Sequence, residues 1–133
     1  AGWMLRWVGH DAVALLDGGL AAWLAAGGRV DRSTRPRAAS VVVPRPREEM
    51  LLDADQVRAG LEGGRLALLD ARSAERFAGR VEPIDPVAGH VPGALNHPCS
   101  DNVGAGGAFL APEELARRFA ATLAGRDGRQ VAC

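Results

Sequence analysis

Two arginines and two cysteines are the side chains of this sequence best suited to chemistry. Arg72 and Arg76 follow closely on Asp70, where an apolar run ends, and Cys99 and Cys133 lie farther along the chain. A cysteine becomes a nucleophilic thiolate at neutral pH where backbone N–H groups or a helix N-terminus lower its pKa. A guanidinium can hold an anionic group at two points. These residue types allow a thiolate to attack a small anion, although exposed arginines often form only weak surface ion pairs.

The cysteines also have simpler interpretations. Cys133 stands where a short apolar strand is expected to end, a position typical of a small buried hydrophobic residue. Cys99 follows a His-Pro pair and is consistent with a semi-buried thiol outside any site. His90, His97 and Cys99 lack both a fourth ligand and the paired spacing of zinc motifs. The glycine-rich segment 104–107 lacks the correctly spaced third glycine and the preceding strand of a dinucleotide site. We therefore expect no metal and no cofactor.

Composition excludes several classes of partner. The chain has 133 residues and a formal net charge of zero, and all sixteen of its basic residues are arginines. This length is enough for one ordinary domain, and the balanced charge gives no footprint for nucleic acid. No apolar run is long enough to cross a membrane, and two cysteines make no disulfide framework. We expect free cysteines, a cytoplasmic location, and no nucleic-acid or membrane partner.

The chain must then provide elements that position these residues. Residues 2–9 predict the end of a buried helix, residues 12–16 a short strand, and residues 20–26 a second helix after an Asp-Gly-Gly turn. Residues 31–50 predict a linker, because prolines and arginines replace apolar periodicity there.

From residue 51 onward, strands and helices alternate. Asp53 or Asp55 can cap a helix that runs to about Glu62. The remaining pattern predicts a strand, a short helix, a Gly-Pro turn, a longer helix with proline in its first turn, and a second strand, at residues 65–69, 73–78, 89–96, 112–124 and 130–133. The apolar strands lack alternating polar residues, which favours a parallel sheet covered on both faces. The fold class is therefore α/β.

Three segments resemble the rhodanese family. Residues 68–77 and the run Gly89-His90-Val91-Pro92-Gly93-Ala94-Leu95-Asn96 are similar to the family pattern of a strand, Asp-x-Arg, a helix and a Gly-His-x-Pro-Gly-Ala turn. Residues 16–23, Leu-Asp-Gly-Gly-x-x-x-Trp, resemble the final third of such a domain. The resemblance implies a three-layer α/β/α fold in tandem: residues 1–30 as the C-terminal part of a first domain, 31–50 as linker, and 51–133 as a second domain without its C-terminal end.

The same resemblance implies roles for the site residues. Cys133 corresponds to the nucleophile that carries a persulfide, or else to a later cysteine of the family pattern. Arg76 matches the position that binds the anionic donor, and Arg72 a neighbouring arginine at the substrate site. Asp70 and His90 match residues that hold the surrounding loops. The implied partners are a small anionic sulfur donor and a thiophilic acceptor, cyanide or a thiol.

The resemblance leaves the sulfur donor and the activity open. The segment 82–86, Glu-Pro-Ile-Asp-Pro, resembles bacterial thiosulfate sulfurtransferases, so thiosulfate is the preferred donor and 3-mercaptopyruvate the alternative. A catalytically silent binding module is a further alternative. A phosphatase loop, C-x5-R, fails for Cys99 because residue 105 is alanine. We expect a monomer, and we expect the 133 residues to be an incomplete chain that is inactive by itself.

Overall fold

The computed structural model describes residues 2–34, 36–123, 126 and 131–133. The chain divides into two compact units, Ala1–Leu52 and Asp53–Cys133, and each is described by itself.

Unit 1 contains two short helices and one helical turn. They are α1 (Gly2–Trp7), α2 (Gly19–Ala25) and the 3-10 turn η1 (Glu48–Met50). Both predicted helices are present, but α1 is not buried, since Trp3 is 49% exposed. The predicted strand at 12–16 is wrong, because this segment has no regular structure. A strand needs a neighbour for its backbone hydrogen bonds, and the described part of unit 1 offers none.

The predicted linker at 31–50 has no helix or strand in its described residues before η1. Its last part is nevertheless tied to the segment around α1. The backbone N–H of Arg47 donates to the carbonyl oxygen of Trp7 at 2.9 Å, and the Arg47 guanidinium grips both carboxylate oxygens of Asp11 at 2.8 and 2.6 Å. As the structure divides the chain, these linker residues belong to unit 1.

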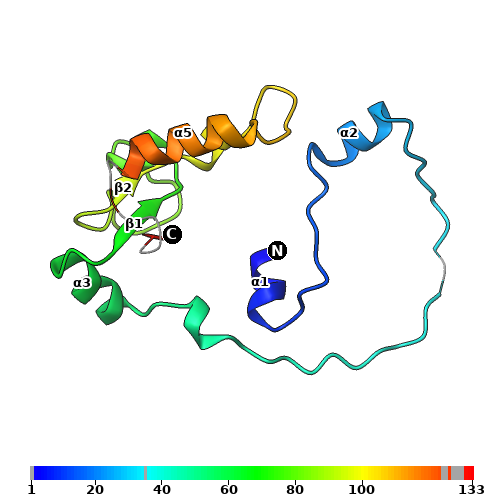
Figure 1. Cartoon of the computed structure of the whole chain (residues 1–133), viewed down its shortest axis with the longest axis horizontal. Helices are drawn as coiled ribbons and strands as arrows, with labels where there is room; N and C mark the ends of the chain where they lie inside the picture. Colours follow the sequence, from blue (N-terminus) through cyan, green and yellow to red (C-terminus); the bar gives the residue numbers. More distant parts are fainter. Residues whose placement is uncertain (1, 35, 124–125, 127–130) are drawn as a thin grey trace. The chain divides into compact units, whose positions relative to one another are not determined.

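Unit 2 is a small α/β unit around a three-stranded sheet (Figure 1). Strand β1 (Ala67–Asp70) lies between β2 (Leu95–Asn96) and β3 (Val131–Ala132). Both pairings are parallel: Asp70 aligns with Asn96, and Leu68 with Ala132. The parallel sheet that the sequence predicts is confirmed. Strand β2 falls in the segment that was expected to be only a turn.

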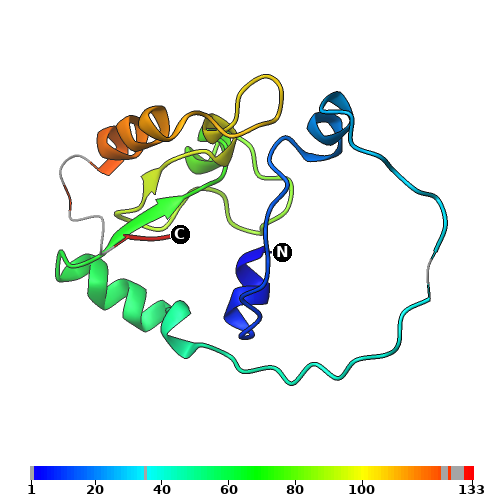
Figure 2. The same ribbon diagram turned by 45° about the vertical axis from the view of Figure 1, so that its right-hand side comes forward.

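Helices lie on both sides of this sheet. They are α3 (Ala54–Glu62), α4 (Ala74–Phe77) and α5 (Pro112–Leu123), with a 3-10 turn η2 (Cys99–Asn102) after β2. In both views α5 lies on one side of the strands and α3 on the other (Figures 1 and 2). No helix in the described part of the chain is long and apolar enough to cross a membrane.

Local sequence explains where these helices begin. Asp53, rather than Asp55, caps α3: its side chain accepts the Gln56 backbone N–H at 2.8 Å, and the Gln56 side chain accepts the Asp53 N–H at 2.8 Å. This reciprocal capping box satisfies two N–H groups that a helix start leaves unpaired. Ser73 caps α4, and its hydroxyl oxygen accepts the Arg76 N–H. The cap on α4 therefore fixes the helix that presents Arg76.

The core of unit 2 is centred on β1. Ala67 and Leu69 of β1 are buried together with Ala94, next to β2, and with the imidazole of His97. The alternate residues of β1 face outward from this core, as the period of two in a strand requires. The loops that follow β1 and β2 therefore emerge at one edge of the sheet, at the carboxyl ends of the parallel strands.

Candidate functional site

Arg72 connects the end of β1 to two distant loop segments. Its Nη2 donates to Asp70 Oδ2 at 2.6 Å and to the Gly89 carbonyl oxygen at 2.7 Å. Its Nε donates to Asp70 Oδ1 at 3.0 Å, and its Nη1 to Glu82 Oε2 at 3.2 Å. Every nitrogen of this guanidinium therefore has a partner. Arg72 holds the Gly-His-Val-Pro-Gly turn against the end of the central strand.

Arg76, in the last turn of α4, binds the same acidic loop. Its Nη2 donates to Glu82 Oε1 at 2.7 Å and to Asp85 Oδ2 at 3.0 Å, and its Nε donates to Glu82 Oε2 at 3.3 Å. Its Nη1 has no hydrogen-bond partner among the described residues. Of the two predicted anion-binding arginines, Arg76 is thus the one with a guanidinium nitrogen left for a further acceptor.

Glu82 bridges the two guanidiniums. Its side chain is only 5% exposed, and it pairs with Arg72 at 3.2 Å and with Arg76 at 2.7 Å. The backbone N–H groups of Ile84 and Asp85 also donate to it, at 3.1 and 3.0 Å. These hydrogen bonds, that from Arg76 first, lower the pKa of Glu82 to about 2. We call Asp70, Arg72, Arg76, Glu82 and Asp85 the arginine–carboxylate cluster.

Sequence reasoning did not assign Glu82 or Asp85 to the site. It placed them in a donor-related segment, but it had no means to pair them with particular arginines. The signal available was two carboxylates in a short proline-rich loop soon after two arginines. That signal indicates an ion-pair cluster only once the loop is known to fold back over α4.

The backbone after β1 is fixed by its neighbours. The Asn96 side chain amide donates to the carbonyl oxygens of Asp70 at 3.0 Å and Arg72 at 2.9 Å. The hydrogen bond from Arg72 is also the main reason that the pKa of Asp70 is lowered, against the opposing effect of burial. Asp70 is therefore ionised at neutral pH and orients Arg72.

His90 connects the turn to α4. Its Nδ1 donates to the Phe77 carbonyl oxygen at 2.7 Å, and its ring stacks on the Phe77 ring with centroids 3.6 Å apart. These contacts bring the Gly-His-Val-Pro-Gly turn beside the helix that carries Arg76. The described contacts of His90 therefore join the turn to the end of α4.

Both cysteines are free and exposed, and both follow strands of the sheet. Cys133 comes directly after β3, whose Ala132 aligns with Leu68 of β1. It therefore stands at the carboxyl edge, where β1 ends and the segment that carries Arg72 begins. Cys99 begins η2, and its N–H donates to the Ala71 carbonyl oxygen at 2.9 Å. The expectation that Cys99 is semi-buried is wrong, since η2 lies at the surface.

His97 has a role that the sequence did not indicate. It is 7% exposed and stacks on Phe119 of α5, with ring centroids 4.2 Å apart. Its Nε2 donates to Asn102 Oδ1 at 2.9 Å, and its Nδ1 lies 2.8 Å from Thr122 Oγ1. His97 therefore connects the end of β2 to α5. Within the described ranges, no three His, Cys, Asp or Glu side chains gather as metal ligands.

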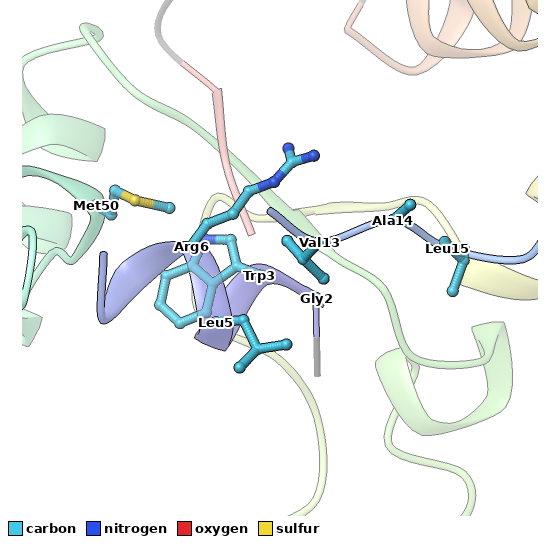
Figure 3. Close-up of a pocket in the computed structure, with 8 residues that line it drawn as sticks. All are labelled: Gly2, Trp3, Leu5, Arg6, Val13, Ala14, Leu15 and Met50. Carbon is cyan, nitrogen blue, oxygen red and sulfur yellow. The ribbon is translucent and has the colours of Figure 1, made fainter. Parts of the chain in front are cut away.

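An apolar hollow of unit 1 carries none of these groups (Figure 3). It has a volume of about 500 Å³ and is lined by α1, by η1 and by the segment after α1, through Gly2, Trp3, Leu5, Arg6, Val13, Ala14, Leu15 and Met50. Among the described residues that line it, Arg6 is the only charged one. It offers no nucleophile, so the candidate chemistry belongs to unit 2.

The structure was compared with known protein structures, and the matches have the rhodanese fold. The structure matches SseA of Escherichia coli, which has the rhodanese fold, with a TM-score of 0.81 and 27% identity over 99% of this chain and 50% of that one. An ergothioneine biosynthesis enzyme of Chlorobium limicola shares the fold alone, with a TM-score of 0.80 and 22% identity over 91% of this chain and 31% of that one. The fold is thus rhodanese-like α/β, as the sequence predicted.

Sequence relatives define the family more closely. A probable 3-mercaptopyruvate sulfurtransferase of Pseudomonas aeruginosa is 50% identical over 127 residues, which are 95% of this chain and 45% of that protein. A putative thiosulfate sulfurtransferase of Mycobacterium tuberculosis is 42% identical over 115 residues, which are 83% of this chain and 39% of that protein. No family model matches. The chain is a homologue of 3-mercaptopyruvate and thiosulfate sulfurtransferases, and it spans less than half the length of these relatives.

Proposed function

We propose that this chain carries the sulfur-transfer site of a sulfurtransferase, with Cys133 as nucleophile. The observation that supports this most is the position of Cys133 directly after β3, at the edge where β1 leads into the arginine–carboxylate cluster. Loops at the carboxyl ends of parallel strands are the usual place for a ligand in open α/β sheets. We do not propose Cys99 as the nucleophile, because it begins the surface turn η2 after β2.

In the proposed reaction, the Cys133 thiolate attacks the outer sulfur of the donor. With thiosulfate, the new S–S bond forms while the donor's S–S bond breaks, and sulfite leaves with that electron pair. The persulfide then passes its outer sulfur to cyanide or a thiolate, which gives thiocyanate or a new persulfide and regenerates the Cys133 thiolate. With 3-mercaptopyruvate, the C–S bond breaks instead, and the thiol proton ends on the carbon of the pyruvate formed.

Arg76 is our candidate for the donor-binding group. Its Nη1 has no partner in the described part of the chain, whereas each nitrogen of Arg72 already has one. A guanidinium held on one side by Glu82 presents its remaining N–H groups in a fixed direction, and this favours a carboxylate or sulfonate. We assign Arg72 a positioning role beside the donor site, where it holds the surrounding loops in place.

Both thiosulfate and 3-mercaptopyruvate remain candidate sulfur donors in this proposal. The acidic segment 82–86 favours thiosulfate, and the relative that is 50% identical, a probable 3-mercaptopyruvate sulfurtransferase, favours 3-mercaptopyruvate. We further propose a cytoplasmic location, since two free cysteines suit a reducing compartment. We also propose a monomer. Residues 1–30 are proposed to be the end of a first rhodanese-like domain, which makes a tandem arrangement.

The test is sulfur transfer by the purified full-length gene product with each donor in turn. Cys133→Ser should abolish thiocyanate release from cyanide and remove the mass increase of one sulfur atom that the donor produces. Cys99→Ser is the matched control and should keep both. Full turnover by Cys133→Ser would refute Cys133 as nucleophile. Absence of turnover with both donors in the parent protein would favour the silent binding module.

A further inference from the structure

We propose that Asn96 is a positioning residue for the first half of the transfer, in which the Cys133 thiolate takes sulfur from the donor. Its side-chain amide holds the backbone that leads from β1 to Arg72 and Arg76. The inference rests on the proposed function, because it assumes Cys133 as nucleophile and Arg76 as the donor-binding group.

Asn96 stands where the pairing of β1 with β2 ends. Asp70 and Asn96 are the last aligned pair of these strands. The carbonyl oxygens of Asp70 and Ala71 accept the backbone N–H groups of residues 97 and 99, at 3.0 and 2.9 Å. The Asn96 amide adds two hydrogen bonds, to the carbonyl oxygens of Asp70 at 3.0 Å and Arg72 at 2.9 Å. This single NH2 group therefore extends the contact between the two segments to the Arg72 carbonyl.

The Arg72 carbonyl lies just before the helix that carries Arg76. It belongs to the peptide bond that joins Arg72 to Ser73, and Ser73 caps α4. An amide NH2 has two donor hydrogens, and Asn96 uses both on this backbone. Because α4 has only four residues, its direction depends on what holds its two ends. Asn96 holds the chain at its start, and His90 holds it at its last residue.

This backbone runs between the two strands that flank β1. Asn96 ends β2 on one side, and Cys133 follows β3 on the other. A donor held at Arg76 must bring its outer sulfur to the Cys133 thiolate, so the distance between these two groups has to be kept. A displacement of about 1 Å can cost about a hundredfold in rate. Discharge of the persulfide to an uncharged thiol needs no anion at Arg76, and it should therefore depend less on Asn96.

The two half-reactions can be timed separately in single turnovers of the purified full-length gene product. Persulfide formation with thiosulfate or 3-mercaptopyruvate is followed by mass spectrometry, and its discharge is followed with dithiothreitol. Asn96→Asp keeps the size of the side chain but places a carboxylate opposite two carbonyl oxygens. Persulfide formation should slow by about tenfold to a hundredfold, while the rate of discharge stays close to that of the parent. Asn96→Ser removes the amide without adding a charge and should shift the ratio of the two rates in the same direction.

Two controls separate positioning from a general loss of stability. Asn102→Asp makes the same change from amide to carboxylate in η2, and it keeps the oxygen that accepts the His97 ring N–H at 2.9 Å. Asp53→Ala removes the capping box of α3, outside the cluster, and so lowers stability. Neither control should change the ratio of the two rates.

Two results would overturn the role of Asn96 while leaving the proposed function intact. One is a ratio of the two rates in both Asn96 variants that equals that of the parent, and the other is equal slowing of both half-reactions. A parent protein that forms no persulfide with either donor would instead refute the proposed function, and the role of Asn96 with it.

Discussion

Replacement of Arg76 tests the site most directly. In Arg76→Ala the donor loses the guanidinium nitrogen Nη1 that has no partner in the described structure, and Glu82 loses hydrogen bonds of 2.7 and 3.3 Å. A hydrogen bond to a charged group contributes ~1.5–3 kcal/mol. If the donor makes one such bond to Arg76, its KM should therefore rise by about tenfold to a hundredfold, since 1.4 kcal/mol is a factor of ten.

The assay is initial-rate thiocyanate release over a range of donor concentrations. A rise in KM with little change in kcat indicates lost binding of the donor. Arg76→Lys should fall between the parent and Arg76→Ala, because an ammonium keeps the charge but cannot grip Glu82 and the donor in two directions. Arg117→Ala is the matched control, since Arg117 also pairs with a glutamate, Glu114, at 2.7 Å but lies exposed on α5. A KM unchanged in Arg76→Ala would remove Arg76 from the donor site.

Two further predictions concern stability. The pKa of Glu82 is lowered from 4.5 to about 2, so its ionised form stabilises the folded state above pH 4.5, and this contribution is lost as pH falls toward 2. Acid unfolding of Glu82→Gln should therefore lack part of the parent's pH dependence in that window, and an identical pH profile would contradict the assignment. His97→Ala should lower the free energy of unfolding in urea by ~2–4 kcal/mol, because it removes two hydrogen bonds and a ring stack from a buried position. His97→Phe keeps the stack and should lose about half as much, and a loss below ~0.5 kcal/mol in His97→Ala would show that the ring contributes little.

Much of the secondary structure could be predicted because its signals are local. Asp53 and Gln56 form a capping box within one helical turn, and Pro112 begins α5 as expected of proline in a first turn. Two segments were predicted wrongly, because a strand depends on partners that are distant in the sequence. Residues 12–16 have the apolar character of a strand but no neighbour in the described part of unit 1. Strand β2 was missed because its two residues are a strand only through their pairing with β1.

For a similar reason, the sequence could indicate only some members of the arginine–carboxylate cluster. Asp70, Arg72 and Arg76 lie in short motifs that carry the resemblance, as does His90 in the adjoining turn. The roles of Glu82 and Asp85 could not be found in this way. Nothing in their local sequence tells which carboxylate will be buried between two guanidiniums and which will face solvent.

The sequence by itself determined the kind of protein: an α/β chain with rhodanese motifs, two free cysteines, arginines after an apolar strand, and helix starts set by local caps. Only the tertiary structure decided which hydrogen bonds these side chains form and which of them are buried. Every nitrogen of the Arg72 guanidinium has a hydrogen-bond partner, whereas Nη1 of Arg76 has none among the described residues. The Glu82 side chain is buried, and that of Asp85 is exposed. The physical reason is that hydrogen bonding and burial of these side chains depend on loops that are distant in the sequence. The packing of the whole unit sets how close those loops come to the strands.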